Sequence, residues 1–245
     1  MRQIAFIGGF DKFDLILYTA IIMANQNKAR CLIVDSTNQE KARYIVPTLE
    51  NENYTRDKYI TTFQGVDVAV GFKTREELNE YGVYQASQDE EGNVSYKYDY
   101  IFIDLDESRT LDSLMLNEND LIFLTTAFDL YSLNKALRVL DTTNVKLPIH
   151  KILFGKKIKN THITYMESVV GNRNINWGKY NIEFPYENGD WSVIQENQRE
   201  NRLTLIKLSN KFKSGLKALV KVVTDTSMMD INNTVNRMQK QERRN

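Results

Sequence analysis

The chain has little of several residues that define specialised classes of protein. Its 245 residues include one cysteine, three prolines and two histidines. A single cysteine excludes a disulfide framework, and the place of Cys31 in the apolar run RCLIVD favours a buried thiol over a reactive one. The two histidines have no cysteine or carboxylate partner in ligand spacing. The sequence therefore predicts neither a disulfide-rich domain nor a metal site.

Excess charge and long hydrophobic runs are also missing. Lysine plus arginine equals aspartate plus glutamate at 32 each, so no global positive field draws the chain to nucleic acid. No run reaches the roughly 18 consecutive apolar residues of a transmembrane helix. The first residues enter a strand pattern directly, without the features of a signal peptide. We therefore expect a cytoplasmic protein with no transmembrane segment.

What is present is an alternation of short apolar runs with helical patterns. Because the runs are apolar on both faces, they are typical of strands in a covered parallel sheet. Strands are predicted at 3–7, 30–34, 66–71, 99–104, 120–125, 149–154 and 181–184. Helices are predicted at 14–26, 74–81, 129–141 and 200–222, and residues 50–64 and 85–98 are polar. The pattern predicts an α/β fold of three layers, with a mainly parallel seven-stranded sheet flanked by helices.

The distribution of polar residues predicts one domain followed by a tail. We assign residues 1–224 to the α/β domain and residues 225–245 to a polar, basic C-terminal tail. The tail carries a narrow apolar stripe that suits a short amphipathic helix, formed by Met228, Ile231, Val235 and Met238. It has few large apolar residues and no Trp or Phe, so we expect partner docking or disorder there rather than membrane insertion.

The stretch IAFIGGFDKFDLILYTA, residues 4–20, has the local layout of a phosphate-binding loop. A strand leads into Gly8 and Gly9, then Lys12, then a helix. In such loops backbone N–H groups and a helix start form a positive concavity, a lysine neutralises phosphate, and a Ser or Thr hydroxyl binds Mg²⁺. Here Phe13 stands where the hydroxyl is needed, and Asp11 stands where a glycine usually precedes the lysine.

The ordered series of motifs resembles the ParA/MinD family of P-loop ATPases. The segment IAFIGGFDKFDLILYTAIIMANQNKARCLIVDST is similar to the family's opening strand, loop, helix and second strand. YDYIFIDLD is similar to its second acidic strand, and IEFPYE to its late strand ending in a proline turn. The resemblance covers roughly residues 1–222. It implies a P-loop fold, and it implies that the nucleotide-binding positions are Gly8, Gly9, Lys12, Asp35 and Asp104.

Departures from the family's pattern gather at the loop. The family's signature lysine is Ile7, the glycine before the retained lysine is Asp11, and the two following threonines are Phe13 and Asp14. We interpret Asp11, Phe13 and Asp14 as residues that block the motif. A carboxylate about 4 Å from a phosphate charge costs on the order of 4 kcal/mol at an effective dielectric constant near 20. Our hypothesis is that Asp11 or Asp14 accepts the free N–H groups of the helix start and pairs with Lys12.

Other interpretations of these residues stay open. Lys12 can keep a weak phosphate contact or serve only in a structural ion pair. Asp35 and Asp104 end strands, where ligands bind in open α/β sheets, but aspartates at such positions also cap helices and form turns.

Lysines gather late in the chain, at Lys207, Lys211, Lys213, Lys217 and Lys221. In DNA-partitioning relatives a basic surface near the last helices binds DNA without sequence preference, and a nucleic-acid or partner surface is one interpretation of these residues. A solvated helix face is the interpretation we prefer. DNA is therefore the less favoured partner.

The resemblance and its departures together favour a pseudo-ATPase that positions or scaffolds a secretion, pilus or conjugation assembly, similar to the atypical ParA-like localisation proteins of tight-adherence pilus systems. We expect no catalytic residue, no cofactor and no metal, with ATP and Mg²⁺ as the alternative. Expected partners are proteins of a membrane-associated machine, which would recruit the chain to the membrane, and a second copy of the chain. The first alternative function is an ATP-binding switch for DNA or cargo partitioning with weak ATPase activity. The second is a Rossmann-type enzyme, in which Asp35 would be the acid that ends the second strand.

Overall fold

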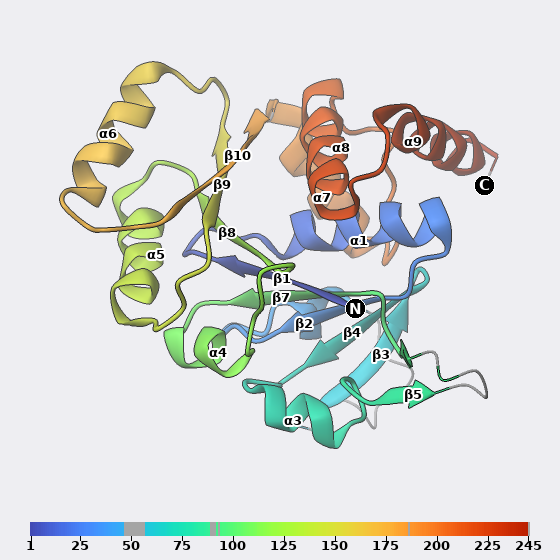
Figure 1. The fold of residues 1–245 in the computed structure, drawn as a ribbon. Coiled ribbons are helices and arrows are strands. Elements are labelled where there is room, and N and C mark those ends of the chain that lie inside the picture. Colours follow the sequence, from blue (N-terminus) through green and yellow to red (C-terminus); the bar gives the residue numbers. More distant parts are fainter. Residues whose placement is uncertain (47–56, 89–91, 93, 186, 245) are drawn as a thin grey trace.

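The apolar runs form the strands of a single sheet that contains eight strands among the described residues, one more than predicted (Figure 1). The computed structural model describes residues 1–46, 57–88, 92, 94–185 and 187–244. The strands are β1 (Arg2–Ile7), β2 (Cys31–Asp35), β3 (Tyr59–Phe63), β4 (Val66–Val70), β7 (Tyr100–Leu105), β8 (Leu121–Thr126), β9 (Ile149–Gly155) and β10 (Trp177–Pro185). Their order is β10-β9-β8-β1-β7-β2-β4-β3, and all neighbours are parallel except the antiparallel pair β3 and β4.

Helices cover both faces of this sheet. They are α1 (Phe13–Asn27), α2 (Ala42–Ile45), α3 (Arg75–Glu80), α4 (Ser108–Ser113), α5 (Leu130–Thr142), α6 (Asn160–Val170), α7 (Asn188–Arg199), α8 (Asn210–Thr224) and α9 (Met228–Glu242). Along β1, Ile4 and Phe6 pack with α1, α8 and α9, whereas Ala5 and Ile7 pack with α3, α4 and α5. Because both faces of the strand are buried, its sequence shows no polar alternation. The predicted three-layer α/β fold with a mainly parallel sheet is confirmed.

The eighth strand comes from a segment that the sequence analysis interprets as polar. Strand β3 lies at the sheet edge, with Tyr59 and Phe63 buried and Thr62 exposed. An edge strand needs only part of its surface to be apolar, so its composition stays polar on average. The sequence analysis predicts no strand over residues 59–63 for this reason, and residues 50–56 lie outside the described part of the chain. Residues 86–88 and 94–96 pair as a separate hairpin, β5 (Ala86–Gln88) and β6 (Val94–Tyr96).

The predicted helix at 200–222 is wrong at its start. Helix α7 ends at Arg199 and α8 begins only at Asn210, after an N-cap at Ser209 whose hydroxyl accepts the N–H of Phe212 at 3.1 Å. Leu205 and Leu208 are buried, but they lie in the irregular connection between the helices. The sequence analysis does not predict helices α6 and α7, because many of their residues are exposed and few are buried.

The C-terminal segment is ordered and helical over α9. Ile231 is fully buried, and Val235 and Met238 are buried with it in the core cluster that contains α1 and α8. Glu242 accepts the backbone N–H groups of Leu205 and Ile206, both at 2.9 Å. Residues 228–242 thus form the amphipathic helix that the apolar stripe suits, and of the two alternatives of docking or disorder, disorder is wrong for them, because the stripe packs on this chain's own helices. The domain boundary at residue 224 stays a prediction.

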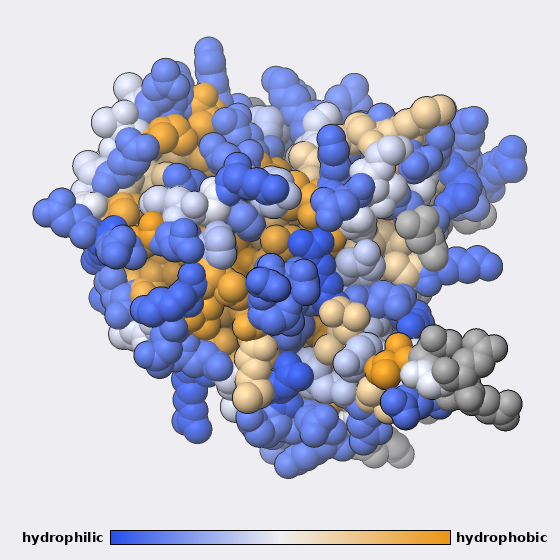
Figure 2. All heavy atoms as spheres, viewed as in Figure 1, coloured by the Kyte–Doolittle hydropathy of each residue, from blue (hydrophilic) through white to orange (hydrophobic). Residues whose placement is uncertain are grey.

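Most of the surface shown in Figure 2 is polar. Hydrophobic atoms show mainly on the side of α5, α6 and the strands β8 and β9, at the left of the view. Among the described residues, no helix is long and apolar enough to cross a membrane.

Candidate functional site

The loop between β1 and α1 lies at the carboxyl ends of the central strands, against β8 and α5. Gly8 has a backbone φ of 134°, and a Cβ there would come within 2.2 Å of the Thr125 carbonyl oxygen. A Cβ on Gly9 would lie 2.9 Å from the Cβ of Lys135. The two glycines are therefore required by the close approach of the loop to its neighbours, whatever ligand the site takes.

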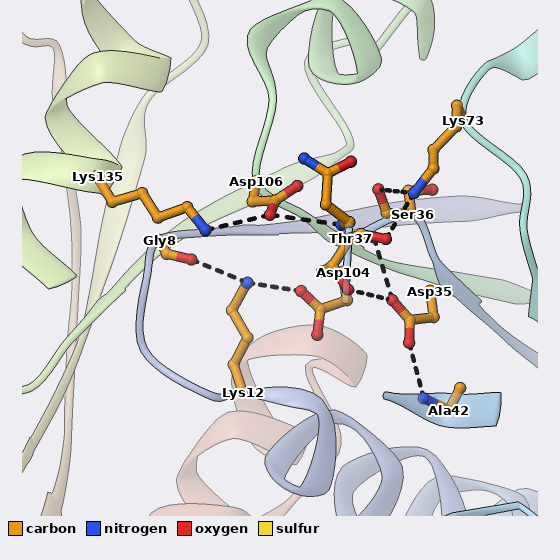
Figure 3. A network of polar contacts seen from close by, with 11 residues as sticks. Gly8, Lys12, Asp35, Ser36, Thr37, Ala42, Lys73, Asp104, Asp106 and Lys135 are labelled. Carbon is orange, nitrogen blue, oxygen red and sulfur yellow. Dashed lines mark hydrogen bonds and ion pairs between the residues drawn. The ribbon is translucent and has the colours of Figure 1, made fainter. Parts of the chain in front are cut away.

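Lys12 is bound inside the fold. Its ammonium lies 2.6 Å from Oδ1 of Asp104 and donates a hydrogen bond of 3.1 Å to the Gly8 carbonyl oxygen (Figure 3). Both charged side chains are almost completely buried. A buried ion pair needs close contact and additional hydrogen bonds, and this one has the close contact together with the bond from Lys12 to Gly8. The two residues that the sequence suggested for phosphate and metal are therefore each other's partners.

The two aspartates of the loop pair with a different lysine. Lys41 contacts Asp11, and its ammonium lies 2.6 Å from Oδ2 of Asp14. The other carboxylate oxygen of Asp14 accepts a hydrogen bond of 2.7 Å from Gln198 on α7. The N-cap residue of α1, Lys12, makes no side-chain capping hydrogen bond. The hypothesis that Asp11 or Asp14 caps this helix and pairs with Lys12 is therefore wrong, because Lys41 reaches both carboxylates from the segment after β2.

Phe13 belongs to the hydrophobic core. It is the first residue of α1 and is 1% exposed, within the cluster formed by the helices α1, α8 and α9 and one face of the sheet. The position that follows the lysine therefore points an apolar ring into the interior, where it contributes packing and offers no oxygen to an ion.

Asp35 shapes a turn beside the site. One carboxylate oxygen accepts the N–H of Ala42 at 2.8 Å, and the other accepts the N–H and hydroxyl of Thr37 at 3.1 and 2.7 Å. Asp35 is fully buried and does not line the cavity at the loop. Its interpretation as a turn-forming residue is the one that its bonds support, and it has no exposed oxygen for a ribose or a metal.

Gly8, Gly9, Lys12 and Asp104 line a polar cavity of about 200 Å³, which we call the cradle. Several residues that sequence reasoning missed also line it, namely Thr37, Gln39, Lys41, Asp106 and Lys135. Lys135 lies 3.3 Å from Asp106, across the cradle from Lys12 (Figure 3). The position of Asp106, two residues after Asp104, could have suggested it. Lys41 carries no such signal, because it lies in a polar segment without periodicity.

Burial decides the protonation of the carboxylates around the loop. It raises the pKa of Asp104 to about 7, although Lys12 opposes the shift and Asp35 adds to it. Burial also raises the pKa of Asp14, against the opposing attraction of Lys41. For Lys41, burial lowers the pKa, but attraction to Asp14 and Asp11 outweighs it, so the net pKa is raised. Among the described residues, no group of three or more His, Cys, Asp or Glu side chains is placed to hold a metal ion.

A second cavity of about 440 Å³ adjoins the cradle, and Phe10 and Asp11 line both. We call it the groove. Its apolar walls come from the loop, the end of β9, and the helices α1, α7 and α8, and it is lined by Phe10, Leu15, Phe154, Trp191, Ile194 and Phe212. Phe10 stacks on Phe154 with ring centroids 4.4 Å apart. The sequence analysis did not find this site, because its residues come from five separate segments.

The late lysines do not form one free basic face. Lys207 lies 2.8 Å from Glu196, and Lys211 lies 3.3 Å from Glu187. Lys217 donates a hydrogen bond of 2.9 Å to Asn232 on α9. Burial and the charge of Lys217 lower the pKa of Lys213. Lys221 is exposed near the end of α8.

Two solved structures show the same fold. A candidate plasmid partition protein from Borrelia burgdorferi B31, solved with bound AMPPNP, matches with a TM-score of 0.55 and 17% identity, over 92% of this chain and 100% of that one. The MinC:MinD cell division complex of Aquifex aeolicus matches with a TM-score of 0.53 and 15% identity, over 93% and 97% of the two chains. No protein-family model matches the chain, and no curated protein matches it in sequence.

These likenesses define the class of fold. The chain has the α/β architecture of the ParA/MinD partition and cell-division ATPases, with a mainly parallel sheet flanked by helices. At this identity the likeness carries the fold alone, and activity has to be argued from the site.

Proposed function

We propose that this chain is a ParA/MinD-like pseudo-ATPase that acts as a positioning or scaffold factor. The observation that carries the proposal is the state of Lys12, whose ammonium is bound to Asp104 and the Gly8 carbonyl inside the fold. A lysine that is to neutralise phosphate must be free to leave such partners. Leaving would strand a buried carboxylate, which costs about 3–5 kcal/mol in comparable pairs.

The rest of the loop does not fit a magnesium nucleotide. Phe13 is buried where Mg²⁺ would take a hydroxyl ligand, and Mg²⁺ has few protein ligands to lose. Asp11 and Asp14 place two carboxylates beside the path of a phosphate chain, and Lys41 is held by both of them. The cradle of about 200 Å³ is also smaller than the roughly 300–1,000 Å³ of most ligand sites. We therefore derive no catalytic step from these residues.

A protein with this fold that does not hydrolyse ATP can still act by binding partners through its surface. The proposed role is to mark where a secretion, pilus or conjugation machine assembles, with the chain in the cytoplasm and recruited to the membrane by a protein partner. The similar MinD of Aquifex aeolicus was solved in complex with a protein, MinC. A homodimer of this chain would form through protein contacts without a bridging nucleotide.

An ATP-binding partition switch with weak ATPase activity is the second candidate. One observation favours it: Gly8, Gly9, Lys12 and Asp104 line one cavity together, and Lys41 and Lys135 line it too. If the aspartates of the loop turned away, three ammonium groups would face that cavity. This candidate requires measurable ATP affinity and, for DNA as cargo, a salt-sensitive association with DNA.

A titration with a fluorescent ATP analogue, with and without Mg²⁺, tests the proposal. We expect no Mg²⁺-dependent binding by the unmodified protein. The matched gain-of-function variant combines Asp11→Gly with Phe13→Thr, which removes one carboxylate and supplies the missing hydroxyl. Because Phe13 is a core residue, circular dichroism must first show that this variant is folded. Binding by the double variant alone supports the proposal.

Tight Mg²⁺-dependent binding by the unmodified protein, abolished by Lys12→Ala, would contradict the proposal and establish the switch. A duplex DNA titration at low and moderate salt separates the two candidates further. The scaffold predicts no association that weakens with salt. A salt-sensitive association reduced by Lys221→Ala, with Lys156→Ala in the segment after β9 as the control, would favour the switch.

A further inference from the structure

The groove beside the cradle has the properties of a binding site that the proposed loss of turnover leaves unused. Its apolar walls come from the loop, α1, α7, α8 and the end of β9, and its volume of about 440 Å³ lies within the usual range for ligand sites. Trp191 on α7 lines the groove, and its side chain is 47% exposed. Large aromatic side chains that stay exposed beside an apolar cavity are typical of binding surfaces.

The walls of the groove are fixed in place before any ligand arrives. Asp190, at the start of α7, accepts the N–H and hydroxyl of Ser209 at 2.6 and 2.8 Å, which ties α7 to the start of α8. Gln198 ties the other end of α7 to Asp14. Behind the groove, Phe154 stacks on Phe184, whose ring meets Phe212 edge-on with centroids 5.5 Å apart. A preformed site loses little entropy when it binds a ligand.

The charges around the groove select the sign of its ligand. Four carboxylates line it, from Asp11, Asp14, Glu187 and Asp190, and no lysine or arginine does. Two lysines contact these carboxylates from outside the lining, Lys41 at Asp11 and Asp14, and Lys211 at Glu187. With every group ionised, four negative charges face two positive ones. Asp11 and Glu187 are the exposed members, with side chains 38% and 58% accessible. Even if the buried Asp14 holds a proton, the carboxylates that line the groove outnumber the lysines that contact them, so the groove favours a cationic ligand over an anionic one.

We propose that the groove is the docking site for an extended peptide segment of a protein partner, in which an aromatic or large aliphatic side chain stands next to a lysine or arginine. The apolar side chain packs in the cavity against Phe10, Phe154 and Ile194. The cationic side chain lies against Trp191, whose ring face attracts cations, and against the carboxylates of Asp11 or Glu187. This inference rests on the proposed scaffold function and specifies the chemistry of its partner.

Selection from a library of short random peptides displayed on phage, with the full-length protein as bait and no nucleotide present, tests this inference. We expect selected peptides to share an aromatic or aliphatic residue beside a basic one. Their affinity should fall at least about tenfold in Trp191→Ser and about threefold in Glu187→Gln. Tyr131→Ser is the matched control, because Tyr131 is also exposed but lies on α5 outside the groove, and it should bind normally. Binding should weaken as NaCl rises from about 0.05 to about 0.5 M.

Three results would overturn the inference. The first is a selection that enriches no motif, or enriches an acidic one. The second is that Trp191→Ser leaves the affinity of the selected peptides unchanged. The third is that a nucleotide or a second copy of the chain occupies the groove. ATP that displaces the peptides would identify a nucleotide as the occupant and would also contradict the scaffold function. A dimer that Trp191→Ser dissociates in sedimentation would identify a second copy. Absence of both peptide and ATP binding would remove the docking site while leaving the scaffold function intact.

Discussion

The cradle and the groove share Phe10 and Asp11, yet they differ in nearly every physical property. The cradle is small and polar, and its charged groups are paired within the chain, Lys12 with Asp104 and Lys135 with Asp106. The groove is about twice as large and mostly apolar, and its carboxylates outnumber the lysines that contact them. The comparison teaches that one loop can border two sites, of which one is filled by partners within the chain while the other stays open.

The two sites differ because the cradle buries charged groups, whereas the groove is lined mainly by apolar side chains. Charges in the cradle are buried, so they need partners in the folded chain at all times. The groove buries apolar surface, and a ligand can cover that surface later without leaving a charge unpaired. Residues of the cradle should therefore matter most for folding stability, and exposed residues of the groove most for binding.

Among the residues that line the cradle, Lys12 should matter most for stability. Lys12→Ala removes the partner of the buried Asp104 carboxylate, and we expect the free energy of unfolding to fall by about 3 kcal/mol, the lower end for such pairs, because Asp104 can take up a proton. Urea denaturation followed by circular dichroism measures it. Lys58→Ala is the control, since both members of its ion pair with Glu77 are partly exposed and its loss should cost less than about 1 kcal/mol. Equal losses in the two variants would show that the Lys12 pair is not the special one.

Gly8→Ala should cost no more than that, about 2–3 kcal/mol. The backbone φ of 134° is rare for residues with a side chain, and the new Cβ would meet the Thr125 carbonyl oxygen at 2.2 Å. Gly189→Ala on α7 is the matched control, because nothing lies within 4 Å of a Cβ there. Thermal or urea unfolding of both variants checks the prediction, and a Gly8→Ala protein as stable as the control would refute the close approach of loop and strand.

The pH dependence of stability should show a smaller effect of the cradle. Because burial raises the pKa of Asp104 from 3.8 to about 7, the folded state holds this proton more tightly than the unfolded state. The contribution of Asp104 is therefore fully present below pH 4 and is lost as the pH rises through 7. We expect the stability difference between the protein and Asp104→Asn to fall by about 2 kcal/mol from pH 5 to pH 8. A difference that stays constant or rises over this range would contradict the direction of the shift.

The groove should show the smallest effect on stability. Trp191→Ala removes a side chain that is 47% exposed, so we expect the free energy of unfolding to change by less than about 0.5 kcal/mol. Phe184→Ala behind the groove should cost about 3–5 kcal/mol, since that ring is fully buried against Phe154 and Phe212. Urea denaturation of the two variants gives the comparison. A large loss in Trp191→Ala would mean that this residue is part of the core and unsuited to docking.

Much of the fold could be predicted from the sequence, because a strand that is buried on both faces of the sheet is a continuous run of apolar residues. Runs such as QIAFI and DYIFID are apolar at every position or nearly so, and they became the central strands β1 and β7. The edge strand β3 and the helices α6 and α7 could not be predicted in the same way. Each exposes much of its surface, so its apolar residues are too few to show a period.

For the candidate site too, local features could be predicted from the sequence, whereas contacts between distant segments could not. The sequence by itself determined that a glycine pair and Lys12 follow a buried strand, that Asp35 and Asp104 occur at strand ends, and that no hydroxyl follows the lysine, because these features are local. Only the tertiary structure decided that Lys12 binds Asp104, that Lys41 takes Asp11 and Asp14, and that five segments enclose the groove. Ion pairs form between groups that the fold brings within a few ångströms, and residues distant along the chain carry no mark of that proximity in their order.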